Sequence, residues 1–535
     1  MKTKHIFLLA IAAGALAPLL WLAITAPTEG LNFPSDDAWI HQVFARNIAR
    51  SGMFAYNPGE RSVGVTGPLW TLAASEFHFF RLPFIPATIA LSILSHVLWV
   101  AAIFWLMRAV WPEERGWWAA AAAVLFTVLG PPVWFAVSGM ETSLFFALAT
   151  LAAAALGRGR HAWAGLAAAA TVPVRPEGGL LVAMLFLWWV WRLWREKRKP
   201  LAGEVVGYVA MPLLVITPFL AQNIIVGGSL MPTTFGGRHW LYAGADAVSH
   251  VITWRGPAIL AFYWYRYIHV WTLGWNDFCN GAKIFTDPVV FSQLGLWVAV
   301  FFIFRRRLNA GLAFFIIWVL GHNLLYGFFL TNFGTAGRYQ GCNFALFAVG
   351  LVFGAKTFYD WARDRAVKAV PIIFVGAALV SAGGSYYQWR LMYADNIYHI
   401  THVHEAAGKW VAANIPPGEH IAAFDIGAFG YYANHYVVDL GGLVDPEAVR
   451  YLKRKEMCTY IHERNVRYVA LMELDSPEIR PLGERFGFYR DMGSAMNMSL
   501  VRAWELPVAR RSWLGVTAIA YPTLSFYEVY YYKQF

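Results

Sequence analysis

Two adjacent carboxylates, Asp36 and Asp37, stand in the stretch SDDAWIHQVFARNIARSG, close to an apolar run long enough to cross a membrane. Ser35 is a good N-cap, and Gly52 is a good C-terminal residue, for a helix between them. Both carboxylates would then lie in the first helical turn, where the helix dipole keeps a carboxylate ionised, as a general base must be. Acid–base chemistry is one interpretation of the pair, and simple capping of the helix is the other.

The same helix is predicted to be amphipathic and to lie in the membrane interface. Ile40, Val43, Phe44 and Ile48 recur on one side, and polar residues recur on the other. The polar side carries His41, Gln42, Arg46 and Arg50. We include His41 among the candidate substrate-binding residues.

Other polar residues stand at the predicted ends of apolar runs, where a charge is a functional candidate by default. They are Glu141, Arg175, Glu177, Thr233, Thr234, Arg238, Arg338 and Tyr339. Carboxylates together with arginines suggest an acid–base step beside a phosphate, because the arginine fork matches phosphate oxygens. The structural alternatives are a helix-capping acid at Glu141, an ion pair between Arg175 and Glu177 at a helix break, and an interfacial arginine at Arg338.

The composition of the 535-residue chain is that of a polytopic α-helical membrane protein. It is 58% hydrophobic and 14% charged, whereas a soluble chain carries about 25% charged residues. The formal net charge of +11 is expected from cytoplasmic loops that collect Lys and Arg. No basic run accompanies an RNA- or DNA-binding motif, so we exclude nucleic acid as a partner and expect membrane lipids instead.

Metal and disulfide sites are not expected. The three cysteines, Cys279, Cys342 and Cys458, have no CxxC spacing, which argues against a zinc site and a disulfide framework. The adjacent pair Asp36–Asp37 alone offers too few oxygens for a divalent cation. We therefore predict no metal and no cofactor.

About eleven membrane spans are predicted from runs of some 20 apolar residues. They are 6–26, 86–108, 117–133, 139–157, 162–174, 178–194, 203–225, 288–304, 309–330, 340–356 and 369–386. With the N-terminus inside, this number places all the basic clusters, including RLWREKRK at 192–199 and RRR at 305–307, on the cytoplasmic side. The candidate site residues then fall on the extracytoplasmic side.

The chain is expected to form two parts. Residues 1–386 are interpreted as a transmembrane catalytic domain with a long first outer loop at 27–85. From about residue 387 the pattern changes to short helices and strands, among them YVVDL and VRYVALM. Residues 387–535 are therefore predicted to be an extracytoplasmic α/β domain.

Several motifs, in their order along the chain, resemble the C-type glycosyltransferase superfamily, in particular the branch of the mycobacterial terminal arabinofuranosyltransferase. The matching motifs are DDAWI, YNPGE, TGPLW, SGMET, RPEG, the PTT loop and GRY, with DIGAFGYY and DLGGLVDPE in the tail. The resemblance implies a bacterial inner-membrane enzyme that transfers a sugar from a polyprenyl-phosphate donor with inversion. Arabinofuranose is one possible sugar, and aminoarabinose, mannose and other hexoses stay open. The acceptor would be a glycan, lipid or protein of the cell envelope.

The resemblance also implies roles for individual residues. Asp36 matches an acid of the first outer loop that acts as base, and Asp37 is its partner. Arg338 matches a basic residue near the lipid phosphate, with Tyr339 beside it. The loop with Arg238 departs from relatives, which have Asn-Thr and Lys where this chain has Thr-Thr and Arg.

Two other classes of protein compete with this interpretation. A secondary transporter would also carry intramembrane charges, but it would show internal repeats and matching broken spans, which the sequence lacks. A non-catalytic assembly protein of the envelope would have no need of the acid pair. A transfer assay with a labelled polyprenyl-phosphate sugar separates the three.

Overall fold

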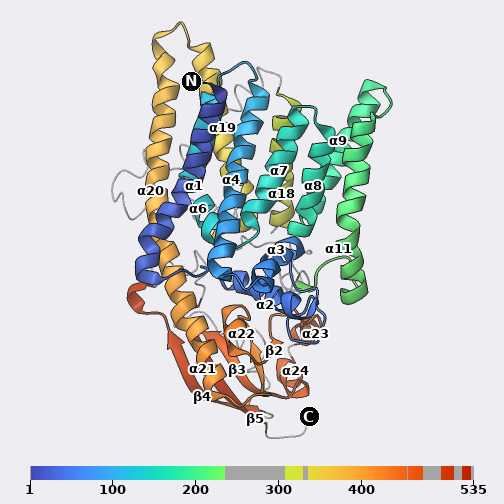
Figure 1. Cartoon of the computed structure of the whole chain (residues 1–535), viewed down its shortest axis with the longest axis vertical. Coiled ribbons are helices and arrows are strands. Elements are labelled where there is room, and N and C mark those ends of the chain that lie inside the picture. The colour runs from blue at the N-terminus through green and yellow to red at the C-terminus, as the bar shows by residue number, and fades with distance from the viewer. Residues whose placement is uncertain are drawn as a thin grey trace, which may run out of the picture. The chain divides into compact units, whose positions relative to one another are not determined.

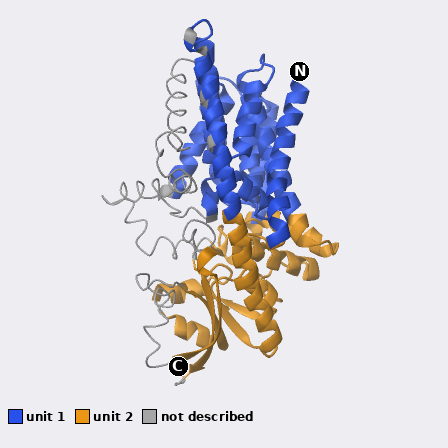
Figure 2. Ribbon diagram, turned by 90° about the vertical axis from the view of Figure 1, so that its left-hand side faces the viewer, with its two compact units in different colours: residues 1–28, 89–219, 255–391 blue, residues 29–88, 220–254, 392–535 orange. Residues whose placement is uncertain are grey.

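The computed structural model describes residues 2–234, 308–328, 335–454, 456–473, 496–510 and 521–531. The chain divides into two compact units (Figure 2). Unit 1 comprises residues 1–28, 89–219 and 255–391, and unit 2 comprises residues 29–88, 220–254 and 392–535. Unit 2 thus holds residues 29–85 of the predicted first outer loop together with residues 392–535 of the predicted tail domain.

Unit 1 is built from helices (Figure 1). Their bounds are α1 Thr3–Glu29, α4 Phe84–Val110, α5 Trp117–Thr127, α6 Gly130–Val137, α7 Thr142–Gly157, α8 His161–Val174, α9 Gly178–Glu196, α10 Ala202–Val205, η1 Val206–Ala210, α11 Met211–Gly227, α18 Ala310–Phe328, η2 Thr335–Gln340, α19 Cys342–Trp361, η3 Ala366–Ala369 and α20 Val370–His399. A few of these helices run on into unit 2 at one end.

Among the described residues, five helices are long and apolar enough to cross a membrane, or six if one bent pair is a single span. Helices that are hydrophobic all round suit a membrane, where each helix satisfies its own backbone hydrogen bonds. Every predicted span except 288–304, which lies outside the described residues, coincides with a helix or with the bent pair. The count of eleven spans stays a prediction.

The predicted span 117–133 is not one straight helix. It is divided into α5 and α6, which are bent by 70°. Pro131 and Pro132 favour a new helical start, and the absence of a side chain at Gly130 lets Trp389 pack closely against the break. A Cβ atom at Gly130 would lie 2.5 Å from that ring.

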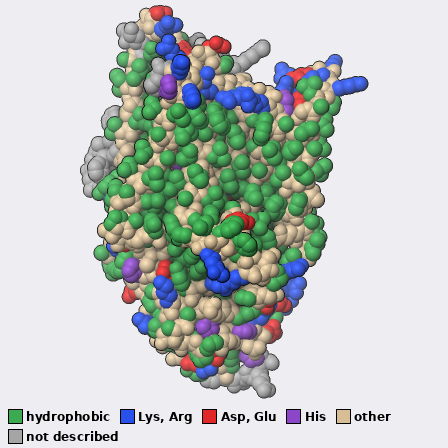
Figure 3. All heavy atoms as spheres, viewed as in Figure 1, with side chains coloured by type: hydrophobic (Ala, Val, Ile, Leu, Met, Phe, Trp, Pro, Cys, Tyr) green, Lys and Arg blue, Asp and Glu red, His purple; other side chains and the backbone are tan. Residues whose placement is uncertain are grey.

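The surface of unit 1 separates apolar from basic residues. On the face in Figure 3, hydrophobic side chains cover the sides of the helices, and Lys and Arg gather at the end where the N-terminus lies. Arg108 in the last turn of α4, Arg158 after α7 and Arg195 in the last turn of α9 contribute to the basic ends. This distribution is the one that the positive-inside rule describes.

Unit 2 combines short helices with a sheet. The helices are α2 Asp36–Ser51, α3 Pro68–Phe79, η4 Ile400–Glu405, α21 Ala406–Asn414, α22 Ala428–Ala433, α23 Ala448–Arg454, α24 Met457–Glu463 and η5 Val508–Arg510. The strands are β1 His420–Ala423, β2 Tyr436–Asp439, β3 Val466–Glu473, β4 Met496–Glu505 and β5 Thr523–Tyr531. The predicted strands at YVVDL and VRYVALM are confirmed as β2 and β3.

The five strands form one sheet in the order β2-β1-β3-β5-β4. β1 pairs in parallel with β2 and β3, whereas β5 pairs antiparallel with β3 and β4. Val43 and Phe44 of α2 share a buried core with Ile421 of β1 and Val469 of β3. The helix that carries the acid pair is therefore an integral part of the α/β core.

The prediction of a helix at the acid pair is confirmed, and its C-terminal end at Gly52 is also confirmed, with φ of +71° at this glycine. His41 and Gln42, on the polar side of the predicted interfacial helix, are buried in the structure, because α3 and the start of α4 cover them. His41 Nδ1 lies 2.8 Å from Thr71 Oγ1, and the Gln42 side chain donates to Thr88.

Candidate active site

The Asp36 carboxylate is held by the backbone at the start of α22. Its Oδ2 accepts the Gly427 N–H at 2.7 Å, and its Oδ1 accepts the Ala428 N–H at 2.7 Å. These N–H groups stand at a helix start, where the first N–H groups lack partners within the helix and favour an anion. Asp36 thus caps a second helix across unit 2, in addition to starting its own.

The stretch DIGAFGYY makes this contact possible through two glycines. A Cβ atom at Gly427 would lie 2.0 Å from the Asp36 carbonyl oxygen, and one at Gly430 would lie 2.1 Å from the Tyr56 hydroxyl. Tyr56 in turn donates a hydrogen bond to the Ile426 carbonyl oxygen at 2.5 Å. The first-loop segment and α22 therefore approach each other closely because glycine stands at both positions.

A histidine and a third carboxylate lie beside Asp36. His404 Nδ1 is 3.7 Å from Asp36 Oδ1, and His404 Nε2 is 3.9 Å from Asp425 Oδ2. Both separations exceed a hydrogen bond, so the ring lies between the carboxylates without a direct bond to either. The side chains of Asp36 and Asp425 are 16% and 30% exposed, which leaves both carboxylates partly open to a ligand.

Burial and mutual repulsion make this cluster ready to accept a proton. Burial raises the pKa of Asp36 from its ordinary value of 3.8 to about 7, although the two backbone N–H groups oppose this rise, and Asp37 adds to it. Burial and the charges of Asp36 and Asp37 raise the pKa of Asp425 well above its usual range. Because a general base works best when its pKa lies near the working pH, Asp36 is suited to that role.

In unit 1, three of the predicted residues meet in one buried network. The Arg175 guanidinium donates to Glu141 Oε1 at 2.7 Å and to Glu177 Oε1 at 2.5 Å. The Tyr326 hydroxyl donates to the same Glu177 oxygen at 2.6 Å. The ion pair between Arg175 and Glu177, which was the structural alternative to a functional role, is present, and Glu141 and Tyr326 join it.

Arg338 and Tyr339 adjoin this network. Arg338 is 2% exposed, donates to the Tyr339 hydroxyl at 3.0 Å and contacts the Met140 sulfur at 3.1 Å. The Tyr339 ring lies 4.6 Å from the Arg175 guanidinium carbon. Two arginines therefore lie against the Tyr339 ring, and one of them, Arg175, also binds both glutamates.

The remaining predicted residues lie elsewhere. Thr233 donates to the Leu443 carbonyl oxygen at 2.9 Å, Thr234 is buried, and His41 contacts Thr71. Arg238 lies outside the described residues. The described geometry thus gives Thr233 and His41 local packing contacts within unit 2.

Sequence reasoning did not identify His404 or Asp425 as site residues. The sequence does offer a reason to consider Asp425, because this residue opens the DIGAFGYY motif directly after a predicted short strand. The sequence offers no such reason for His404, because nothing in the pattern distinguishes it from the other histidines of the same helical stretch. Only the fold brings these two residues to the acid pair.

No group of three or more His, Cys, Asp or Glu side chains among the described residues could hold a metal ion. We derive no step through a metal.

The chain has the fold of solved membrane enzymes. It is 13% identical to the Archaeoglobus fulgidus oligosaccharyltransferase in complex with Zn and sulfate, with a TM-score of 0.56 over 86% of this chain and 68% of that one. It is 14% identical to ArnT from Cupriavidus metallidurans bound to undecaprenyl phosphate, with a TM-score of 0.54 over 97% of both chains. It is 12% identical to the oligosaccharyltransferase AglB from Archaeoglobus fulgidus in complex with an inhibitory peptide and a dolichol-phosphate. The TM-score of that comparison is 0.55 over 88% of this chain and 69% of that one.

At this level of identity the likeness shows the fold alone, and that fold agrees with the predicted polytopic membrane protein. The glycosyltransferase activity and the arabinofuranosyltransferase branch stay predictions. The family description "Domain of unknown function (DUF8728)" matches residues 393–530, which belong to unit 2. No curated protein matches the chain.

Proposed function

We propose that this chain is an inverting glycosyltransferase that moves a sugar from a polyprenyl-phosphate donor to an acceptor of the cell envelope. The observation that carries the proposal is the fixed Asp36 carboxylate, whose pKa burial raises to about 7. Two of the enzymes that share the fold were solved with undecaprenyl phosphate or dolichol-phosphate bound, which supports a donor on an isoprenoid lipid.

The proposed reaction needs one base and one phosphate site. A sugar on a phosphodiester already has a good leaving group, so the remaining tasks are to deprotonate the acceptor and to hold the departing phosphate. The acceptor oxygen bonds to the anomeric carbon while the bond from that carbon to the phosphate oxygen breaks. The acceptor proton passes to Asp36, and the electron pair of the broken bond stays on the polyprenyl phosphate, as in an inverting displacement.

The hydrogen bonds to Asp36 suit a base whose position is fixed. Each carboxylate oxygen accepts one backbone N–H and keeps a second lone-pair direction. A base held in one orientation avoids the entropy cost of finding it during the reaction. We assign Asp36 as the base and Asp37 and Asp425 as neighbouring acids that interact with its charge. The His404 ring fills the space between Asp36 and Asp425.

We assign Arg338 to the donor phosphate, with Arg238 as a further candidate outside the described residues. An arginine fork donates two parallel hydrogen bonds to phosphate oxygens. The buried Glu141–Arg175–Glu177 network next to Arg338 would fix the substrate-binding surface of unit 1. Thr233, Thr234 and Tyr339 stay candidates for the same substrate.

The enzyme would act in the bacterial inner membrane with unit 2 on the extracytoplasmic side. Arabinofuranose is the sugar that the arabinofuranosyltransferase resemblance favours. The test is transfer from radiolabelled polyprenyl-phosphate sugars, assayed one sugar at a time with purified protein and membrane acceptors. Loss of label from the lipid into an acceptor supports the proposal. If every sugar stays on its lipid in the presence of envelope acceptors, the chain is not such a transferase.

A further inference from the structure

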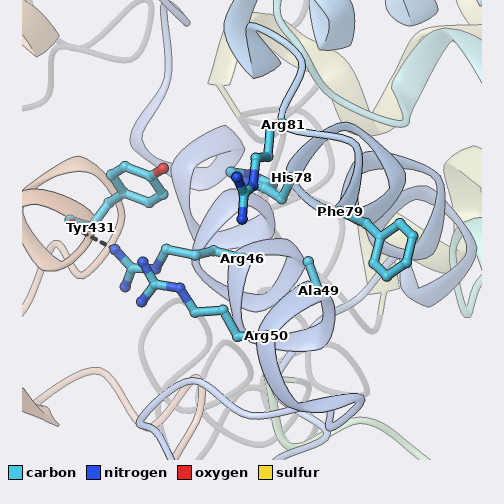
Figure 4. Close-up of a pocket in the computed structure, with 7 residues that line it drawn as sticks. All are labelled: Arg46, Ala49, Arg50, His78, Phe79, Arg81 and Tyr431. Atoms are coloured by element: carbon cyan, nitrogen blue, oxygen red, sulfur yellow. Dashed lines mark hydrogen bonds between the residues drawn. The ribbon is translucent and has the colours of Figure 1, made fainter.

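A cavity of about 440 Å³ opens in unit 2 on the far part of α2, away from the acid pair. Three arginines line it, Arg46 and Arg50 of α2 and Arg81 just after α3. Figure 4 shows the guanidinium groups of Arg46 and Arg50 next to each other, with Arg81 directed toward them. None of the described residues that line the cavity is a carboxylate.

The guanidinium of Arg46 is largely buried and lies next to a second positive charge, that of Arg50. The Arg46 guanidinium lies 4.5 Å from the Tyr431 ring centre and donates to the Tyr431 carbonyl oxygen at 2.9 Å. Its Nε–H is buried and has no acceptor among the described residues. Burial and the neighbouring charge of Arg50 lower the pKa of Arg46. An anion in the cavity would remove this repulsion and accept the remaining N–H.

His78 adds no charge at neutral pH. Burial, and then the charges of Arg46 and Arg50, lower the pKa of His78 to about 4. Its Nε2 lies 3.0 Å from the Gln42 side-chain oxygen. The cavity therefore presents three permanent guanidinium charges beside one neutral imidazole.

The backbone of Arg81 has a conformation that glycine adopts more readily than any other residue. Its φ is +55°, in the left-handed region that side chains rarely adopt. The turn is closed by the Arg81 N–H to the His78 carbonyl and by the Leu82 N–H to the Phe77 carbonyl. A glycine would end this helix without strain. The arginine side chain therefore does not stabilise the turn.

Exposed apolar side chains stand on the same turn as Arg81, and one of them lines the cavity. Phe79 lines it and is 65% exposed, while Phe80 and Leu82 are 64% and 49% exposed. Exposed aromatic residues beside cationic ones are typical of a surface that meets lipid headgroups and the ends of acyl chains. A soluble anion would need the arginines but not the exposed phenylalanines.

We propose that this cavity binds the phosphate of an anionic membrane lipid. Arg46, Arg50 and Arg81 would hold the phosphodiester oxygens through charge-assisted hydrogen bonds, and Phe79, Phe80 and Leu82 would contact the adjoining glycerol and acyl region. The proposal does not depend on sugar transfer, because its measurement is binding.

The test uses the full chain, purified in detergent and incubated with equal amounts of phosphatidylglycerol and phosphatidylcholine that carry the same acyl chains. Native mass spectrometry then measures which lipid stays bound. The variants are Arg81→Gly and Arg50→Gln. The control is Arg61→Gln, which removes an equal charge from an exposed residue of the same unit that does not line the cavity.

The wild type should retain phosphatidylglycerol over phosphatidylcholine. Loss of one charged hydrogen bond weakens binding by roughly tenfold or more, so both cavity variants should lose most of this preference, while Arg61→Gln keeps it. Arg81→Gly should unfold at the same or a higher temperature than the wild type, because it relieves the turn. Equal retention of both lipids, or an equal loss in Arg61→Gln, would overturn the proposal. Binding of millimolar inorganic phosphate that is lost in Arg81→Gly, together with no preference for phosphatidylglycerol in the wild type, would show that the site takes free phosphate and not a lipid headgroup.

Discussion

The carboxylate of Asp36 accepts the backbone N–H of Gly427 at 2.7 Å, across 391 positions of the chain. The contact joins the first turn of α2 to the start of α22 within unit 2. It fixes the orientation of the carboxylate that we assign as the base. The same contact means that Asp36 also contributes to the fold, so tests of catalysis must measure folding alongside.

Gly427→Ala should separate α22 from Asp36. The new methyl group would overlap the Asp36 backbone, and overpacking of this kind typically costs about 1–3 kcal/mol. We expect a lower melting temperature and reduced turnover in the molecules that stay folded. The matched control is Gly179→Ala in α9, where an added Cβ meets nothing within 4 Å. Alanine there should leave the melting temperature unchanged or raise it. Equal effects of both substitutions would contradict this view of Gly427.

The pH dependence of activity and of stability should have opposite signs. Only the ionised carboxylate accepts a proton, so kcat/KM should rise as the pH increases through about 7, the pKa of Asp36. The folded-state pKa of this acid is raised, so its contribution to stability is complete below pH 3.8 and is lost as the pH rises through 7. Because Asp425 interacts with Asp36, the measured value belongs to the pair. A rate that is flat or falls between pH 6 and 8 would argue against Asp36 as the base.

Arg338→Met should weaken the binding of undecaprenyl phosphate. Methionine keeps much of the buried volume beside Met140 but removes the charged donor, and a charged hydrogen bond contributes about 1.5–3 kcal/mol. The comparison variant is Arg158→Met, which removes a partly exposed arginine at the end of α7 in the same unit. Affinity should fall in the first variant and not in the second. Unchanged affinity in Arg338→Met would remove this residue from the phosphate site.

Labelling of introduced cysteines tests the predicted topology. The native Cys342 and Cys458 are buried, and Cys279 would be replaced by serine. In intact bacterial cells, a membrane-impermeant maleimide should modify Glu60→Cys, in the predicted outer loop, and should not reach Lys197→Cys, at the end of α9. Modification at 197 with none at 60 would reverse the orientation of the chain.

Sequence patterns predicted the elements better than their packing. The helix that begins at Asp36, the strands at 436–439 and 466–473, and the helices at nearly all proposed spans are present, because hydrophobic periodicity and capping residues are local signals. The burial of His41 could not be predicted in this way. It depends on α3, which covers that side of α2.

The candidate site was predicted in part for the same reason. Asp36, Glu141, Arg175 and Glu177 stand out because charge beside an apolar run is rare. Asp425 and His404 lie about 370 to 390 positions from Asp36, and only the tertiary fold brings them to it. Which backbone groups hold Asp36 also depends on close approach at Gly427, a contact that no local pattern specifies.

The most direct measurement compares Asp36→Asn with Asp439→Asn. Asp439 is a buried carboxylate in the same unit that also accepts two backbone hydrogen bonds, from the Gly441 and Val444 N–H groups. In both variants the new amide would turn an N–H toward a backbone N–H, so both should lose stability. Turnover per folded molecule, measured with a labelled polyprenyl-phosphate sugar, should fall by a factor of about 10² to 10⁴ in Asp36→Asn only. Turnover close to that of the wild type in folded Asp36→Asn would contradict the account and leave Asp36 as a structural cap.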